Sequence, residues 1–455
     1  MDIKEVIIGQ FPVWYEATIG SGMVLGLIAT VHLLASHVSV GAALVSTWLA
    51  TVAVRQNRPE LLEYIRQYGI FLLVFSYVLG SITGPGIWFS ATVASPRGLS
   101  FLIHTNVFLW ATEWVFFVIE VLIIYLMVYL AGRIDNRSYL KIAWIFGGAS
   151  WATMLVIVGI LSFMLWPGQE SWFTEGGTLR GFFGAYTFAQ ILSRTCFMLM
   201  AAALAGGLIA VRIEDVAFKV EMIKTLSKLG IPAAILGSVF FQCGLTTIPE
   251  SAALLLKTRL PGSFVPSLWA TLFITVAYFS ALLIRPNLLK TPVAVVMLVA
   301  LLVLGIYPEE RAREMMRKPY LAAQSVYSNG LFARPIPWLD IESDLPKLEE
   351  HGALATLPFP PERLQHVTSG NEVEAGQVLV VTYCSSCHGL SDAGPRPFSS
   401  MFGGSTNVAE IEAFIKGTIV TGNMINMPRI PFSDAEVHAV ALFIAAGPLW
   451  QQLNP

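Results

Sequence analysis

Long apolar runs fill the first two thirds of the chain and are separated by short polar connections. A bilayer core of about 30 Å needs roughly 20 apolar residues per helix. The pattern therefore predicts eight membrane-spanning helices, approximately at Gly22–Val54, Gln67–Phe89, Phe101–Ala131, Leu140–Leu165, Phe182–Val211, Leu229–Ile248, Phe264–Ile284 and Thr291–Tyr307. After them the chain becomes charged and proline-rich, and we interpret Pro308-Glu309-Glu310 as the exit from the last span.

Basic residues gather in alternate connections between these runs. They follow the first, third, fifth and seventh spans, as Arg55, Arg58, Arg66, Arg133, Arg137, Lys141, Arg212, Lys219, Lys224, Lys228, Arg285 and Lys290. The positive-inside rule places these connections in the cytoplasm and both chain ends outside. No cleavable signal peptide is evident, so the first apolar helix is expected to act as an uncleaved targeting signal. The expected location is a bacterial inner membrane, with the C-terminal part on the periplasmic side.

Composition supports a membrane protein. Of 455 residues, 55% are hydrophobic and only 13% are charged, whereas soluble chains carry about 25% charged residues. The net charge of −2 argues against a nucleic-acid partner, which would require a basic surface. Cys196 and Cys243 lie inside apolar runs, where a thiol usually behaves as a small hydrophobic group.

The other two cysteines form the strongest chemical signal. Cys384-Ser-Ser-Cys387-His388 is a C-x-x-C-H sequence, which is typical of covalent haem attachment. The two thiols bind the haem vinyl groups, and His388 is placed to bind the iron. A second axial ligand should follow some tens of residues later. Met427 is the best candidate and Met424 its rival, because His/Met ligation suits an electron-transfer haem.

Helices are expected on both sides of this motif. One is predicted around Ala375–Tyr383, and Ser433 to Glu436 is typical of the N-cap and first turn of a terminal helix. Residues 370–449 resemble class I cytochrome c domains. The expected fold class is all-α: a polytopic bundle of about eight transmembrane helices plus a small all-α cytochrome c domain. The expected domains are 1–320 in the membrane, a linker at 321–369, and the periplasmic haem domain at 370–455.

Several ionisable residues lie inside the apolar runs, where they usually mark ligands or proton routes. His32 and His37 are in the first run, and His104 is near the outer end of the third. Glu113 and Glu120 are seven residues apart on the third run, hence on one helix face, and Glu113 reaches about the depth of His32. Each is a candidate ligand or proton carrier. The alternative for each is a polar group satisfied by hydrogen bonds to a neighbouring helix.

The membrane part resembles subunit I of the cytochrome bd-type quinol oxidases. His32 occupies the place of the histidine that binds the active-site haem in that family. Glu314-Met-Met-Arg317-Lys-Pro-Tyr resembles the segment whose Glu ligates the high-spin haem b and whose Arg holds haem charge. The resemblance therefore implies two non-covalent haems of type b or d, with iron ligands at His32 and Glu314. It also implies a proton route through Glu113 and Glu120.

The chain departs from the family in three ways. The fifth run has no histidine and the seventh has no methionine, so the low-spin haem is expected to be missing. The quinol-binding loop is reduced to about Pro249–Ser263. The haem domain takes the place of the ninth span. A second, paralogous membrane subunit, and further subunits, are implied as partners.

Two functions remain open from these residues. The first is a cytochrome c-linked reductase of oxygen, or of nitric oxide, in which Glu113 and Glu120 relay protons and Arg317 assists. The second is a non-catalytic electron-transfer subunit that serves a periplasmic dehydrogenase or cytochrome, with His37 or His104 as second axial ligands. A haem-free membrane anchor for the haem c domain is a third, weaker alternative. Membrane lipid is an expected partner in every case.

Overall fold

The chain folds into an all-α membrane bundle with a small helical domain at one end. A computed structural model describes residues 11–402 and 405–447, so the outer ends of the first and last predicted domains lie outside the described residues. Eight described helices are long and apolar enough to cross a membrane, as expected. They are Ser21–Gln56 (α2), Pro59–Ala94 (α3, η1 and α4), Pro96–Leu130 (α5), Asn136–Leu165 (α6), Ala185–Ala210 (α9), Val216–Leu245 (α10), Phe264–Ile284 (α12) and Thr291–Arg317 (α13, η3 and α14).

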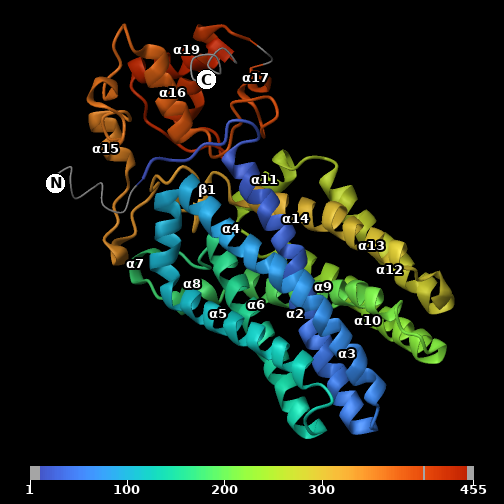
Figure 1. Ribbon diagram of the computed structural model, residues 1–455. Coiled ribbons are helices and arrows are strands. Elements are labelled where there is room, and N and C mark those ends of the chain that lie inside the picture. Colours follow the sequence, from blue (N-terminus) through green and yellow to red (C-terminus); the bar gives the residue numbers. More distant parts are fainter. Residues whose placement is uncertain (1–10, 403–404, 448–455) are drawn as a thin grey trace.

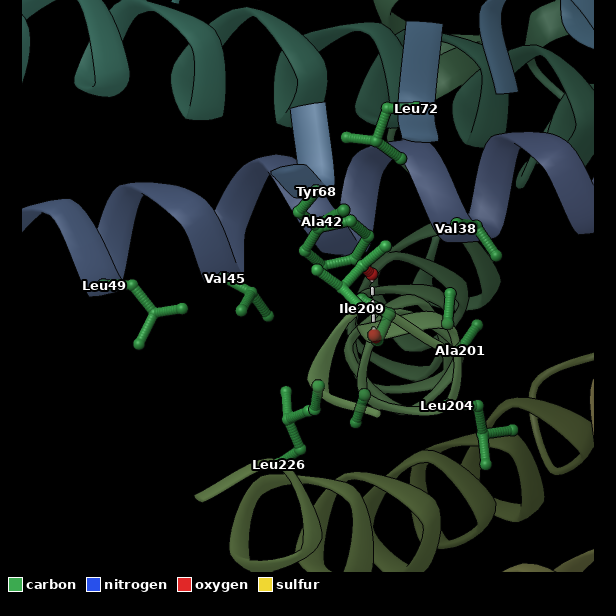
Figure 2. Close-up of a cluster of buried hydrophobic side chains, with 14 of the residues drawn as sticks. Val38, Ala42, Val45, Leu49, Tyr68, Leu72, Ala201, Leu204, Ile209 and Leu226 are labelled. Atoms are coloured by element: carbon green, nitrogen blue, oxygen red, sulfur yellow. Dashed lines mark hydrogen bonds between the residues drawn. The ribbon is translucent and has the colours of Figure 1, made fainter. Parts of the chain in front are cut away.

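Helices α2 and α9 form the centre of the bundle. Small residues on both helices, including Ala42 and Ala201, are fully buried and let the backbones approach closely. Figure 2 shows this core, in which the Tyr68 hydroxyl donates a hydrogen bond of 2.7 Å to the carbonyl of Ala202. This bond satisfies a polar group that apolar surroundings would otherwise penalise. The core therefore fixes α2, which carries His32.

The last span continues further than the sequence predicted. Helix α14 (Tyr307–Arg317) follows α13 (Thr291–Ala300) without a break, through a π-helical turn at Leu301–Ile306. Pro308 occupies the first turn of α14, where its missing N–H is tolerated because the wider turn before it absorbs the lost bond. The prediction that Pro308 marks the helix exit is therefore wrong. As a result, Glu309, Glu310, Arg313 and Glu314 all lie on a helix that packs against α2 and α6.

The C-terminal domain is held by two crossing helices, α16 (Glu372–Tyr383) and α19 (Asp434–Ala446). They cross at Gly376, where an added Cβ would lie 2.1 Å from the carbonyl oxygen of Ala439. Only glycine permits this approach. The predicted cap of α19 is confirmed, since Ser433 and Glu436 form a reciprocal capping box. The shorter helices of the domain are α17 (Phe398–Met401), α18 (Val408–Ile415) and η6 (Lys416–Val420).

The segment between bundle and domain is packed against both. It includes a two-stranded hairpin (β1, Tyr320–Ala322; β2, Val326–Tyr327) and a short helix (α15, Leu345–His351). Its leucines share a hydrophobic core with α16 and α19. On the other side Asp344 forms a two-point ion pair with Arg97 at the start of α5. The segment therefore fixes the domain on the bundle.

Residues 11–20 run between the haem domain and the bundle (Figure 1). The Tyr15 hydroxyl accepts a hydrogen bond of 2.8 Å from the backbone N–H of Leu390. The Ser391 hydroxyl donates to the carbonyl of Thr18. On the bundle side, Trp14 donates its backbone N–H to the carbonyl of Val93 at 2.8 Å. Residues 11–20, which we call the N-terminal strap, thus tie the two parts together.

Candidate haem sites

The C-x-x-C-H segment begins where α16 ends. The Nδ1 atom of His388 lies 2.9 Å from the carbonyl oxygen of Arg396. A carbonyl only accepts, so Nδ1 carries the proton and Nε2 keeps its lone pair, the tautomer that an iron ligand needs. Burial lowers the pKa of His388 to about 4, so the ring is neutral at pH 7. These features fit haem c.

The two thiols are free and have different surroundings. Burial raises the pKa of the Cys384 thiol to about 12. The pKa of the Cys387 thiol is lowered instead. Burial acts to raise this pKa, but the positive charges of Lys318 and Arg396 lower it by more. Glu314 acts on Cys387 as well. The attachment motif therefore lies within electrostatic range of the end of α14.

The motif also touches the start of α2. A Cβ added at Gly22 would lie 3.2 Å from the carbonyl oxygen of Ser386, so glycine lets the motif sit directly on this helix end. The motif thus faces the membrane bundle. Met427 and Met424 share one turn between η6 and α19, where the Met427 N–H donates to the Met424 carbonyl at 3.2 Å. Met427 stays the predicted distal ligand.

His32 has the geometry of a haem ligand. Its Nδ1 lies 3.0 Å from the hydroxyl oxygen of Thr83, whose own proton is donated to the carbonyl of Leu79 at 2.7 Å. The hydroxyl therefore accepts from Nδ1, and Nε2 keeps its lone pair. Gly84 lies beside the ring, since an added Cβ would be 3.5 Å from its Cε1 atom. The Thr83-Gly84 pair thus orients His32.

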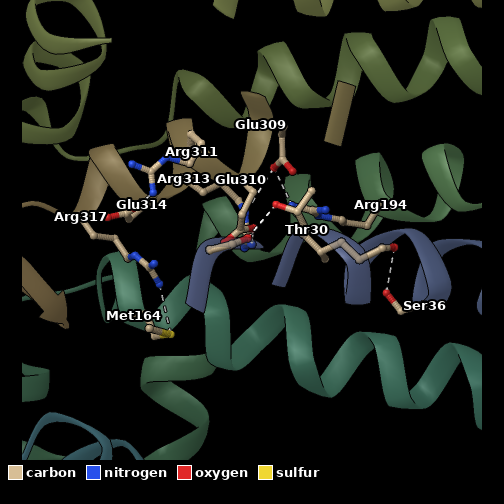
Figure 3. Close-up of polar contacts among 12 residues, drawn as sticks. Thr30, Ser36, Met164, Arg194, Glu309, Glu310, Arg311, Arg313, Glu314 and Arg317 are labelled. Carbon is tan, nitrogen blue, oxygen red and sulfur yellow. Dashed lines mark hydrogen bonds and ion pairs between the residues drawn. The ribbon is translucent and has the colours of Figure 1, made fainter. Parts of the chain in front are cut away.

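Glu314 is surrounded by cations near the C-terminal end of α14. It pairs with Arg311 and, at 3.4 Å, with Lys318. Figure 3 shows Arg317 turned away from Glu314, with its Nη1 atom 3.4 Å from the sulfur of Met164. A carboxylate with two cationic neighbours still has lone pairs for iron, and ligating carboxylates are usually hydrogen-bonded in this way. The surroundings are compatible with the predicted role.

The other two membrane histidines have different environments. His37 is buried, with Nδ1 2.7 Å from the carbonyl of Leu33 and Nε2 3.3 Å from Nη1 of Arg194. Arg194 in turn pairs with Glu309 at 2.6 Å. His104 is exposed and its Nδ1 lies 2.8 Å from the Ser100 carbonyl. Both ring nitrogens of His37 are thus engaged, whereas His104 is bonded within its own helix.

Glu120 is buried at the meeting point of α2, η1 (Leu73–Tyr77) and α5. Its Oε1 atom accepts hydrogen bonds from the Tyr77 hydroxyl at 2.8 Å and from the Ser39 hydroxyl at 3.0 Å. Glu113 is half-buried on the same helix, two turns nearer its N-terminal end. The hydroxyl partners of Glu120 were missed from sequence. Tyr77 and Ser39 lie inside apolar runs, and their position there could have predicted partners for a buried carboxylate.

A second missed feature is the charged network that joins α9 to α14. Arg194, Glu309, Glu310 and Arg313 form ion pairs within the bundle. The sequence prediction placed Glu309 and Glu310 outside the membrane, so the network could not be seen. Among the described residues no group of three or more His, Cys, Asp or Glu is arranged to hold a bare metal ion. Haem needs only one or two protein ligands, so this finding does not conflict with the predicted haem sites.

Comparisons with known proteins find two similarities. Residues 371–444 match the family described as cytochrome c oxidase, cbb3-type, subunit III. The chain is also similar in structure to the bd oxidase from Geobacillus thermodenitrificans, with a TM-score of 0.55 and 13% sequence identity. The similarity covers 66% of this chain and 87% of that one, and at this identity it shows the fold alone. No curated protein matches. The chain is a multi-pass membrane protein with a cytochrome c domain, built for haem-based electron transfer.

Proposed function

We propose that the protein is a haem oxidoreductase of a respiratory chain that reduces oxygen with electrons received through its own cytochrome c domain, without a quinol site. The observation that carries this proposal is the position of the haem c attachment motif. It sits on the first turn of α2 and lies within electrostatic range of Lys318 and Glu314. A carrier domain that served only external partners would have no reason to cover this end of the bundle.

In this proposal some side chains bind haem and others carry protons. Cys384, Cys387 and His388 would hold haem c, and His32 and Glu314 would hold the membrane haems, either b or d. Bound haem supplies one-electron transfer and, where the iron has an open position, reduction of a small oxidant. Thr83 orients His32 through Nδ1. Glu120, with Tyr77 and Ser39, holds a proton at a buried carboxylate, and Glu113 continues the route outward along α5.

The proposal includes location and partners. The haem domain lies on the periplasmic side of a bacterial inner membrane, where it accepts electrons from a cytochrome or dehydrogenase. The spans that contain α4 and α5 bury only 22% and 17% of their most apolar windows, and side chains such as Phe108 and Trp114 are exposed on them. Such faces suit lipid, a further subunit or both. A second, paralogous membrane subunit is therefore part of the proposal.

The test is a haem count combined with a CO-difference spectrum of the purified complex. One haem c, two non-covalent haems and a CO-binding ferrous haem are expected. His32→Ala should remove one non-covalent haem and the CO signal while haem c remains. His104→Ala is the control, because His104 is exposed and should change neither.

Two outcomes would contradict the proposal. Purely low-spin spectra without CO binding would favour a non-catalytic electron-transfer subunit. If haem c were the only haem found, the membrane part would be a haem-free anchor for the haem c domain. If CO binds, turnover with oxygen or with nitric oxide distinguishes the two possible substrates of the same pocket.

A further inference from the structure

A small polar cavity lies between α6, α9 and α14, beside the charged network. Its volume is about 20 Å³, enough for one small group. Ser162 of α6, Tyr186 and Gln190 of α9, and Arg313 and Arg317 of α14 contribute to its lining. Neither the proposed haem ligands nor the proton route uses this cavity.

Three arginines line the cavity, Arg194, Arg313 and Arg317. Arg194 pairs with Glu309, and Arg313 pairs with Glu309 and Glu310. Within residues 11–402 and 405–447 no ion pair joins a carboxylate to Arg317, whose Nη1 donates to the sulfur of Met164 at 3.4 Å. Buried cations without a close counter-charge are costly, so Arg317 is placed to bind an anion.

Hydrogen-bond donors point to the same conclusion. Gln190 is only 4% exposed, lines the cavity, and its Nε2 atom has no hydrogen-bond partner in the described structure. The Nε atom of Arg313 also makes no hydrogen bond, although it lies 3.4 Å from an oxygen of Glu309. Buried donors are rarely left unpaired in proteins. An acceptor in the cavity would satisfy Gln190 and neutralise Arg317 together.

We propose that this cavity binds one monovalent anion, held by Gln190 Nε2 and the guanidinium of Arg317. The anion we assign to it is a free halide. A haem propionate reaching Arg317 would only repeat the role that the resemblance implies for this arginine, and the experiment separates the two. The halide site is independent of the proposed function.

The experiment uses the complete protein, purified without chloride and equilibrated with sodium bromide, whose anomalous scattering locates it in crystals. A bromide peak between Gln190 and Arg317 is expected for the halide source. Gln190→Leu should lower its occupancy at least tenfold, since a hydrogen bond to a charge is lost. Gln190→Glu should abolish it, because the new carboxylate takes the anion's place. Gln242→Leu is the control, since Gln242 lines a larger neighbouring cavity that includes Arg194 and Arg313 but neither Gln190 nor Arg317.

Continuous density that joins a haem to the cavity, with no bromide in wild-type crystals, would assign Arg317 to a haem propionate and overturn the proposal. Density for water alone, or bromide binding that Gln190→Leu and Gln190→Glu leave unchanged, would overturn the proposal. If the variants do not fold, the wild-type density still decides.

Discussion

At the scale of single residues, the distal ligand of haem c is the sharpest question. Met427 and Met424 share one turn, and both are half-buried. Methionine ligation raises the reduction potential of a haem. Met427→Ala should therefore lower the midpoint potential of haem c, whereas Met424→Ala should leave it near the wild-type value. Spectroelectrochemical titration measures both. The opposite ranking would make Met424 the ligand.

The turn before α2 contains Glu16, from which we predict a pH-dependent contribution to stability. Burial alone would raise the pKa of Glu16, but the backbone N–H groups of Thr18, Ile19 and Gly20 donate to its carboxylate, at 3.0, 2.6 and 3.1 Å, and lower the pKa below its ordinary value of 4.5. A carboxyl whose pKa is lowered in the folded state stabilises the fold at pH values above its ordinary pKa. This stabilisation is lost as the pH falls through the lowered pKa of the folded state.

Glu16→Gln should therefore be less thermally stable than wild type near pH 7, by about 1 kcal/mol at most because the carboxyl is not deeply buried. The difference should shrink as pH falls below 4.5. Thermal unfolding followed between pH 3 and 7 measures it. A difference that stayed constant over this range would show that the charge of Glu16 is not what stabilises the strap.

At the scale of elements, the crossing of α16 and α19 depends on one glycine. Gly376→Ala places a Cβ 2.1 Å from the backbone oxygen of Ala439, which cannot move away as a side chain can. We expect a loss of about 2 kcal/mol or more in the haem domain and a lower yield of haem c. Gly370→Ala is the matched control, since nothing lies within 4 Å of its Cβ. Equal haem c content in both variants would contradict this packing account.

The sequence predicted what local pattern determines. All eight spans and the cap of α19 were found, because helix length and capping depend on neighbouring residues. The continuation of the last helix beyond Tyr307 was not predicted, because Pro308 usually ends a helix. Here a π-helical turn precedes Pro308, and the helix continues. The pairing of Arg194 with Glu309 joins residues 115 positions apart. Such pairing follows from how helices pack, which no short pattern records.

At the scale of the whole molecule, the contact between the attachment motif and α2 should control electron transfer. Gly22→Leu would push the Ser386 carbonyl away from the helix. The rate from haem c to the membrane haems should fall severalfold with haem content unchanged, as measured by flash-induced electron transfer. Gly80→Leu on α4 is the control, because its Cβ meets nothing within 4 Å. An unchanged rate in Gly22→Leu would mean that electrons enter the bundle elsewhere.

The N-terminal strap meets the haem domain, although the two are separated by most of the chain. The strap leaves the ribosome well before its partners Leu390 and Ser391, which follow more than 370 residues later. Thioether bonds to Cys384 and Cys387 need an accessible segment, whereas the folded motif rests on Gly22. Biogenesis should therefore run in a fixed order. The bundle is inserted first, haem is then attached to a C-terminal segment that is still accessible, and the haem domain packs against the strap last. A cell unable to attach haem c would accumulate the unclosed form, with the strap open to proteases.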